Sequence, residues 1–175
     1  MYEFYITIVG AKQGAFKGEG SGKHDGKLVG LAFEQASIAA SGGTGSAKPS
    51  FGPVRFTRRW DAASPQLLTA LATGEVLTDV RFEFLRSNDE GEETVFHAIR
   101  LTGARVIGLR TFIDLEAEPS SLMPLPPLEE VELGFAAMEV ENRAGNTVAM
   151  VGSKPKGKKA PKKAPLPSRS RSKRR

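Results

Sequence analysis

The sequence has no cysteine, only two histidines and only 7% aromatic residues. Without cysteine there is no disulfide, no thiol nucleophile and no thiolate metal ligand, which suits a protein made in a reducing compartment. Two histidines alone make a poor transition-metal site. Hydrophobic residues still amount to 39% of the chain, enough for a core that needs no metal or disulfide. We therefore expect neither a metal centre nor a cofactor.

Long hydrophobic runs are also lacking. No apolar stretch approaches the ~18 residues that a membrane-spanning helix needs. The opening residues 2–10 alternate polar and apolar and include Glu3, whereas a signal peptide has a basic start and an unbroken apolar run. We expect a protein without membrane insertion that is made in the cytoplasm; if it leaves the cell, it does so by a route that needs no Sec-type signal.

Positive charge is concentrated at one end of the chain. Residues 154–175 hold 11 Lys or Arg and no acid, so residues 1–153 keep 14 basic and 20 acidic side chains, a net charge of −6. Few apolar residues and strong like charge predict disorder. We expect a folded domain at 1–151 and a disordered segment rich in Lys, Arg, Pro and Ser at 152–175, called the basic tail below.

Alternation of polar and apolar residues predicts strands over most of the body. Phe4, Ile6 and Ile8 share one face of the first strand, and similar patterns follow at 28–38, 51–60, 80–84, 95–101, 106–109 and 131–135. The phase then shifts, which predicts a bulge near Ala136 and Ala137. Such strands favour a mainly β fold, a compact barrel of two packed antiparallel sheets.

One segment, residues 60–74, breaks the strand pattern. Ser64 is a residue type favoured at the N-cap, Pro65 is favoured at the first helical position, and Gly74 can adopt the left-handed conformation that ends a helix. The leucines at 67, 68 and 71 are expected to share a face. A helix this short is not stable alone, so its leucine face should close one open end of the barrel.

Motifs for catalysis are not convincing. Gly18–Gly22 has the wrong spacing for a dinucleotide loop, and in Gly42–Ser50 a proline separates Lys48 from Ser50, unlike a phosphate-binding loop. We expect His24 to be solvated and His97 to be packed or at a strand edge. No catalytic residue is predicted, and the chain is not expected to be an enzyme.

A family resemblance rests on three stretches taken together. Residues 56–74 contain a strand, a charged corner, Ser-Pro-x-Leu, a short helix and a glycine; a small-residue loop covers 42–50; and residues 129–135 match Glu-x-Val-x-Leu-x-Phe. Over roughly residues 2–142 the chain resembles the Hcp (hemolysin-coregulated protein) family, the tube proteins of bacterial type VI secretion. The signature helix segment comprises Trp60, Asp61, Ser64, Pro65, Leu67, Leu68, Leu71 and Gly74. The chain departs from the family after residue 138 and in its basic tail.

The resemblance implies a structural role, with the protein made in the bacterial cytoplasm and then secreted by the type VI route without a signal peptide. It implies six copies closing into a ring, rings stacking into a tube, a contractile sheath and a VgrG-like spike as partners, and small effectors carried in the lumen. A small-residue loop would then reach the neighbouring ring, and this ring-stacking hypothesis concerns Ser41, Gly42, Gly43, Thr44, Gly45 and Ser46.

The basic tail allows three interpretations. It could bind nucleic acid or another polyanion through counterion release, fold back on the acidic body or an acidic partner, or be a solvated extension. The polyanion hypothesis concerns Lys158, Lys159, Lys162, Lys163, Arg169, Arg171, Arg174 and Arg175. Alternative functions for the whole chain are a nucleic-acid-binding protein that uses this tail and a phage-type tail tube or hub protein.

Overall fold

The structure is a computed structural model that describes residues 4–38, 49–88, 91–113 and 126–152. Its strands form one antiparallel sheet in the order β10-β9-β6-β5-β1-β3-β4-β8-β7, with the short β2 paired to β1. The elements are β1 (Phe4–Gly10), β2 (Gly14–Ala15), the 3₁₀ turn η1 (Gly22–His24), β3 (Leu28–Ile38), β4 (Ser50–Arg59), α1 (Ser64–Thr73), β5 (Leu77–Ser87), β6 (Glu93–Thr102), β7 (Arg105–Phe112), β8 (Leu128–Gly134), β9 (Ala137–Asn142) and β10 (Thr147–Gly152).

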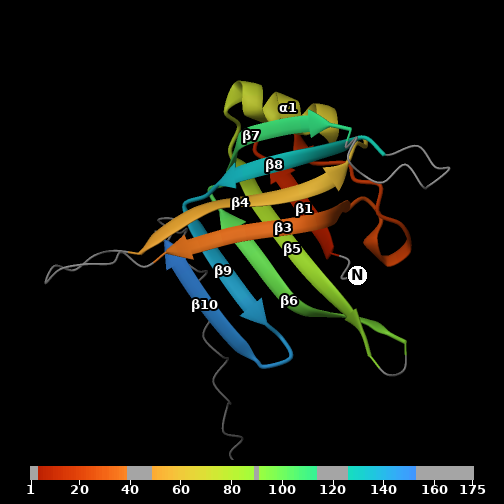
Figure 1. The fold of residues 1–175 in the computed structure, drawn as a ribbon, viewed down its shortest axis with the longest axis vertical. Coiled ribbons are helices and arrows are strands. Elements are labelled where there is room, and N and C mark those ends of the chain that lie inside the picture. The colour runs from red at the N-terminus through yellow and green to blue at the C-terminus, as the bar shows by residue number, and fades with distance from the viewer. Residues whose placement is uncertain (1–3, 39–48, 89–90, 114–125, 153–175) are drawn as a thin grey trace, which may run out of the picture.

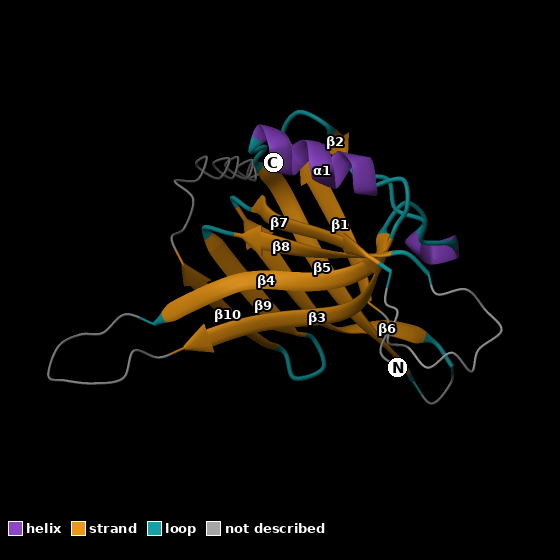
Figure 2. Ribbon diagram, turned by 45° about the horizontal axis from the view of Figure 1, so that its top comes forward, coloured by secondary structure: helices purple, strands orange, loops and turns teal. Residues whose placement is uncertain are grey.

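The sheet doubles over where β1 meets β3. These strands pair only from Phe4 to Ile6, and β3, β4, β8 and β7 then cross over the layer made by β1, β5, β6, β9 and β10 (Figures 1 and 2). This arrangement confirms a mainly β fold with antiparallel layers and one helix. Within the described residues β7 and β10 do not pair, so the barrel is not closed by hydrogen bonds and keeps two sheet edges.

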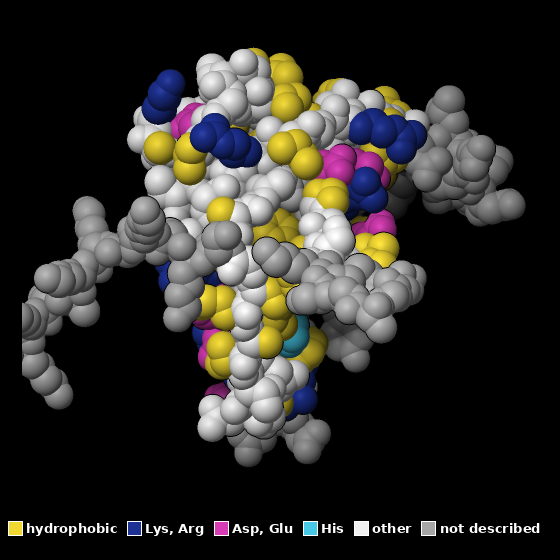
Figure 3. Space-filling model, turned by 90° about the vertical axis from the view of Figure 1, so that its left-hand side faces the viewer, with side chains coloured by type: hydrophobic (Ala, Val, Ile, Leu, Met, Phe, Trp, Pro, Cys, Tyr) yellow, Lys and Arg dark blue, Asp and Glu magenta, His cyan; other side chains and the backbone are white. Residues whose placement is uncertain are grey.

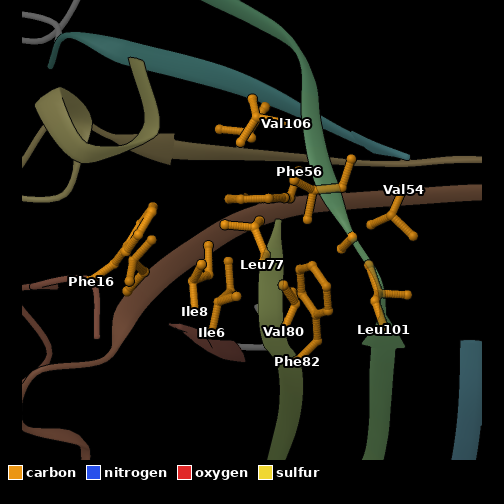
Figure 4. Packing of buried hydrophobic residues seen from close by; sticks show 14 of the residues in the cluster. Ile6, Ile8, Phe16, Val54, Phe56, Leu77, Val80, Phe82, Leu101 and Val106 are labelled. Atoms are coloured by element: carbon orange, nitrogen blue, oxygen red, sulfur yellow. The ribbon is translucent and has the colours of Figure 1, made fainter. Parts of the chain in front are cut away.

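The core lies between the two layers, as the alternating pattern requires. Ile6, Ile8 and Phe82 from one layer meet Val54 and Phe56 from the other, and each is at most 1% exposed (Figure 4). A group of phenylalanine rings extends this core toward the far end of β1 and β5, where the Phe4 and Phe84 ring centroids lie 5.1 Å apart. The apolar faces of both layers are thereby covered.

One glycine is required by this packing. A Cβ added to Gly30 on β3 would fall 1.9 Å from the ring of Phe4, which is paired with it across the strands. Glycine here lets the aromatic ring lie directly against the backbone.

The predicted helix is confirmed as α1, which packs against β7 at one end of the core (Figure 2). Gly74 is left-handed at φ 60°, and its N–H bonds back to the last turn. The N-cap is Ala63, so Ser64 lies one position inside the helix. The predicted leucine face is partly wrong, because Leu67 is fully buried whereas Leu68 is 57% exposed. The N-cap Ala63 and Ala70 are fully buried with Leu67, so small residues make up much of the buried face of the helix.

The predicted bulge near Ala136 is wrong. The chain ends β8 at Gly134 and crosses to the other layer, where β9 begins at Ala137 and pairs with β6. The N–H of Ala136 donates to the carbonyl of Thr102 at this crossing. The phase shift therefore marks a change of layer, and the strand β10 that follows was not predicted from the pattern.

Candidate functional site and assembly surfaces

The signature segment surrounds a buried ion cluster. Arg58 on β4 is 1% exposed, and Glu129 on β8 is fully buried. Arg58 Nη1 donates to Glu129 Oε1 at 2.5 Å, while Nη2 pairs with the carboxylate of Asp61. The hydroxyl of Ser64 donates to the same Glu129 oxygen at 3.0 Å. One guanidinium thus joins β4, β8 and the start of α1.

Two carboxylates share this single cation. Burial raises the pKa of Glu129, and the nearby charge of Asp61 acts in the same direction. Asp61 also accepts the N–H of Ala63 at 2.7 Å, which shapes the turn into the helix. Because buried ions stay charged only when well partnered, these groups fix the corner rather than expose reactive atoms.

The other signature residues support the same corner. The indole N–H of Trp60 donates to the carbonyl of Leu128 at 2.8 Å, although the side chain stays 46% exposed. Pro65 lies in the first turn of α1 and Leu71 packs partly against the core. The signature segment is therefore a structural corner.

A second buried carboxylate, Glu75, was missed by the sequence analysis. Its Oε1 accepts the N–H groups of Gln13 at 2.9 Å and Lys12 at 2.6 Å. Its Oε2 accepts from the Gln13 side chain at 2.8 Å. The backbone N–H of Gln13, followed by that of Lys12, holds the pKa of Glu75 below its ordinary value. Glu75 thereby fastens the β1–β2 hairpin to the end of α1.

The histidines do not form a reactive site. His24 was expected to be solvated, but its side chain is only 13% exposed and its ring stacks on Tyr5 with centroids 3.8 Å apart. Its Nε2 lies 3.4 Å from Glu93 Oε2. His97 is half-buried beside Phe84, as expected for a packed histidine. Across the described ranges, no group of three acidic or histidine side chains is placed to hold a metal ion.

Some of the large apolar side chains that are exposed lie on the two edge strands of the sheet. Ile107 on β7 is 54% exposed, and Val148 and Met150 on β10 are 67% and 50% exposed. Apolar side chains are also exposed among intermixed acidic and basic groups on the side of the molecule shown in Figure 3. Unpaired edges with apolar residues are surfaces on which chains associate.

Cations on the sheet are neutralised locally. Lys27 lies 2.6 Å from Glu83, Arg100 lies 2.7 Å from Asp79, and Arg143 lies 3.4 Å from Glu141. These three cations are therefore less available to a nucleic-acid backbone than unpaired ones would be.

Two of the predicted sites lie outside the described residues. They are the ring-stacking loop, Ser41 to Ser46, and the polyanion-binding residues of the basic tail, Lys158 to Arg175. Among the helices that are described, none has the length and apolar character to cross a membrane.

Comparison with known proteins bears on the family. A sequence model of the family described as "Type VI secretion system effector, Hcp" matches residues 12–141, more than half of the chain. The chain belongs to the Hcp family. The "Major exported protein" of Pseudomonas aeruginosa is 26% identical over 130 residues, which are 67% of this chain and 76% of that protein. Hcp proteins are structural, exported components of the type VI secretion tube.

Solved structures show the same fold. A structure described as "Crystal structure of Hcp protein" has a TM-score of 0.78 at 19% identity and covers 87% of this chain and 98% of its own. The "Secreted protein Hcp3 from Pseudomonas aeruginosa" has a TM-score of 0.71 at 21% identity, covering 89% of this chain and 100% of its own. These likenesses confirm the Hcp fold, and the family match confirms the resemblance seen in the sequence.

Proposed function

We propose that this chain is a tube subunit without enzymatic activity, six copies of which close into a ring. Rings stack into the inner tube of a type VI secretion system, and the tube is expelled. The observation that carries this proposal is the Hcp family match over residues 12–141 together with the shared fold.

The two sheet edges support ring closure. A ring needs heterologous contacts, in which one surface of a subunit meets a different surface of the next. The β7 edge with Ile107 and the β10 edge with Val148 and Met150 are two such surfaces, and both expose apolar side chains. Association would cover the exposed apolar side chains of both edge strands.

Stacking is assigned to the loop at residues 41–46. It follows β3, which with β4 extends beyond the body of the sheet (Figure 1). Deleting residues 42–47 is expected to leave rings intact but to prevent tubes. Normal tubes from that variant would show that the loop has no part in stacking.

The proposed partners follow from the tube. They are further copies of the chain, the sheath, a VgrG-like spike and small effectors in the lumen. Export is supported by the Pseudomonas aeruginosa relative, which is described as a major exported protein; we propose that it needs no signal peptide. We assign the tube domain to residues 1–151 and treat residues 152–175 as a separate segment.

The ring proposal is tested at the β10 edge. The double variant Val148→Asp, Met150→Asp places two charges on exposed positions and should sediment as an 18.8 kDa monomer with an unchanged circular dichroism spectrum. Leu31→Asp is the matched control, because Leu31 is 40% exposed on β3, away from both edges. Rings formed equally by all three proteins would contradict an interface at β10.

A nucleic-acid-binding function is favoured less. A sheet that binds nucleic acid would present rows of basic and aromatic side chains, whereas Lys27, Arg55 and Arg100 are each paired with an acidic side chain. The family match likewise favours the type VI tube over a phage-type tail tube.

A further inference from the structure

A hollow of about 430 Å³ opens on the outer face of β3, β4 and β8. It is lined by Glu34, Arg55, Thr57 and Glu130, among others. Arg55 and Thr57 face outward because the alternate residues of β4 are buried in the core. Thr57 is paired with Glu130, and Arg55 is paired with both Glu34 and Glu132, so the four side chains meet on one face.

The hollow has an excess of carboxylate. Arg55 is already engaged, with Nη2 at 3.0 Å from Glu132 and Nη1 at 3.9 Å from Glu34. Glu130 makes no ion pair with any described residue. Arg110, which is opposite Glu130 in register, holds its guanidinium 4.5 Å from the centre of the Phe112 ring instead. A Lys or Arg side chain entering the hollow would meet Glu130 and Glu34 together.

A second hollow provides a contrast. It measures about 100 Å³ on the outer face of β5, β6 and β9, and its charged lining is Arg81, Arg100, Glu139 and Glu141. Two cations and two anions balance there, so it has no net attraction for a basic segment. The larger hollow differs in having a carboxylate that no described cation neutralises.

The basic tail begins at the end of the molecule toward which β8 runs, and β8 lines the larger hollow. Gly152 is paired with Ala137 at the end of β10, and a Cβ there would lie 2.3 Å from the carbonyl oxygen of Ala136. The chain therefore leaves β10 pressed against the β8–β9 crossing, on the side of the molecule where β8 ends (Figure 1).

The tail is long enough to reach the hollow of its own chain. Glu130 precedes Ala137 by seven residues, at most about 23 Å of strand. An extended chain covers about 3.5 Å per residue, so a lysine six residues beyond Gly152 spans about 21 Å. Lys158, Lys159, Lys162 and Lys163 are the residues at the right reach, whereas Lys154 is too near the exit.

We propose that the basic tail docks on its own chain, with a lysine from 158–163 held in the hollow by Glu130 and Glu34. The sequence gives this tail 11 positive charges, and tethering raises its local concentration into the millimolar range. Exposed ion pairs are screened by salt, so docking holds at low ionic strength and weakens above about 0.3 M. The docked tail is withheld from other polyanions.

Carbodiimide crosslinking with mass spectrometry tests this contact in the full-length protein at 50 mM salt, because the reagent couples lysine amines to carboxylates in contact. Crosslinks are expected from lysines 158–163 to Glu34 and Glu130. Glu130→Gln should reduce the crosslink to the intact Glu34 at least threefold, whereas the control Glu139→Gln, in the balanced hollow, should leave it unchanged. Crosslinks spread evenly over surface carboxylates, or an unchanged Glu34 crosslink in Glu130→Gln, would overturn the proposal.

Two further experiments test which segment occupies the hollow. In an equal mixture of ¹⁴N-labelled and ¹⁵N-labelled protein, own-chain docking gives crosslinked peptide pairs in which both peptides carry the same isotope. Pairs that combine a ¹⁴N peptide with a ¹⁵N peptide would assign the hollow to a neighbour's tail and contradict own-chain docking. With a labelled DNA duplex, Glu34→Gln, Glu130→Gln should bind several-fold more tightly than wild type, because its tail is released. Equal DNA binding would show that the tail is not held by the hollow.

Discussion

Replacing Arg58 should be among the most destabilising changes in this protein. Arg58 is the only cation recorded with Asp61 and Glu129 in the described cluster, and Glu129 is fully buried. Arg58→Met keeps side-chain volume but leaves two carboxylates facing one another without a counter-ion. Removing one partner of a buried ion pair costs about 3–5 kcal/mol.

Urea unfolding measures this loss. Trp60, the single tryptophan, bonds to Leu128 beside Glu129 and reports on the corner by fluorescence, with circular dichroism following the sheet. With a urea slope of about 2 kcal/mol/M, the midpoint should fall by about 1.5–2.5 M. Wild type and variants need one protomer concentration, because self-association shifts apparent stability.

Two further variants sharpen the test. Arg55→Met removes the exposed pair with Glu132 and should cost only about 0–1 kcal/mol. In the double variant Arg58→Met, Glu129→Leu the buried carboxylate is gone, so a favourable coupling of about 2 kcal/mol relative to the summed single changes is expected. A loss below about 1 kcal/mol for Arg58→Met, or no coupling in the double variant, would refute the account of the corner.

Three other predictions concern pH and packing. Burial raises the pKa of Glu129 above its ordinary 4.5, so the contribution of this group to stability is full below pH 4.5 and is lost as pH rises through the raised pKa. The free energy of unfolding of wild type minus that of Glu129→Gln should therefore fall as pH rises over this range. A difference that rises with pH would contradict the prediction. The pH dependence expected for Glu75 is the reverse, because its lowered pKa makes its contribution to stability present above pH 4.5 and lost in acid. Glu75→Ala should lower the free energy of unfolding by about 2 kcal/mol at pH 7 in urea, and by less once acid has protonated Glu75 of the wild type. Gly30→Ala should lower the free energy of unfolding by about 1–3 kcal/mol, because its Cβ would strike the Phe4 ring. Gly134→Ala is the control, since its Cβ would meet only the Ile107 side chain at 3.3 Å. Equal melting temperatures for the two variants would show that the Phe4 ring moves aside.

Local sequence patterns predicted much of the fold. Alternation located the strands at 28–38 and 51–60 to within a residue or so, and the Ser-Pro start with the Gly74 stop located the helix. These features follow from backbone geometry, so each can be predicted from a single short stretch of sequence. The late phase shift was misread, because a bulge and a crossing between layers produce the same change of parity, and only the partners of β8 and β9 distinguish them.

The candidate site was predictable only in part. Trp60 to Gly74 identified the corner, yet the pairing of Arg58 with Glu129 joins residues 71 positions apart and leaves no local mark. The same holds for Glu75 with Gln13, and for the stacking of His24 on Tyr5. Leu68 was assigned to the buried face because leucine is usually buried, whereas Leu67, Ala70 and the N-cap Ala63 line the core and Leu68 is exposed.

Negative-stain electron microscopy of the purified chain tests the central claim most directly. Full-length protein and a variant ending at Ser153 should both give closed rings with six-fold symmetry, since the surfaces assigned to ring closure lie on β7 and β10. Monomers of both proteins at concentrations where rings are expected, or closed rings of another symmetry, would contradict the account of this chain as a hexameric tube subunit.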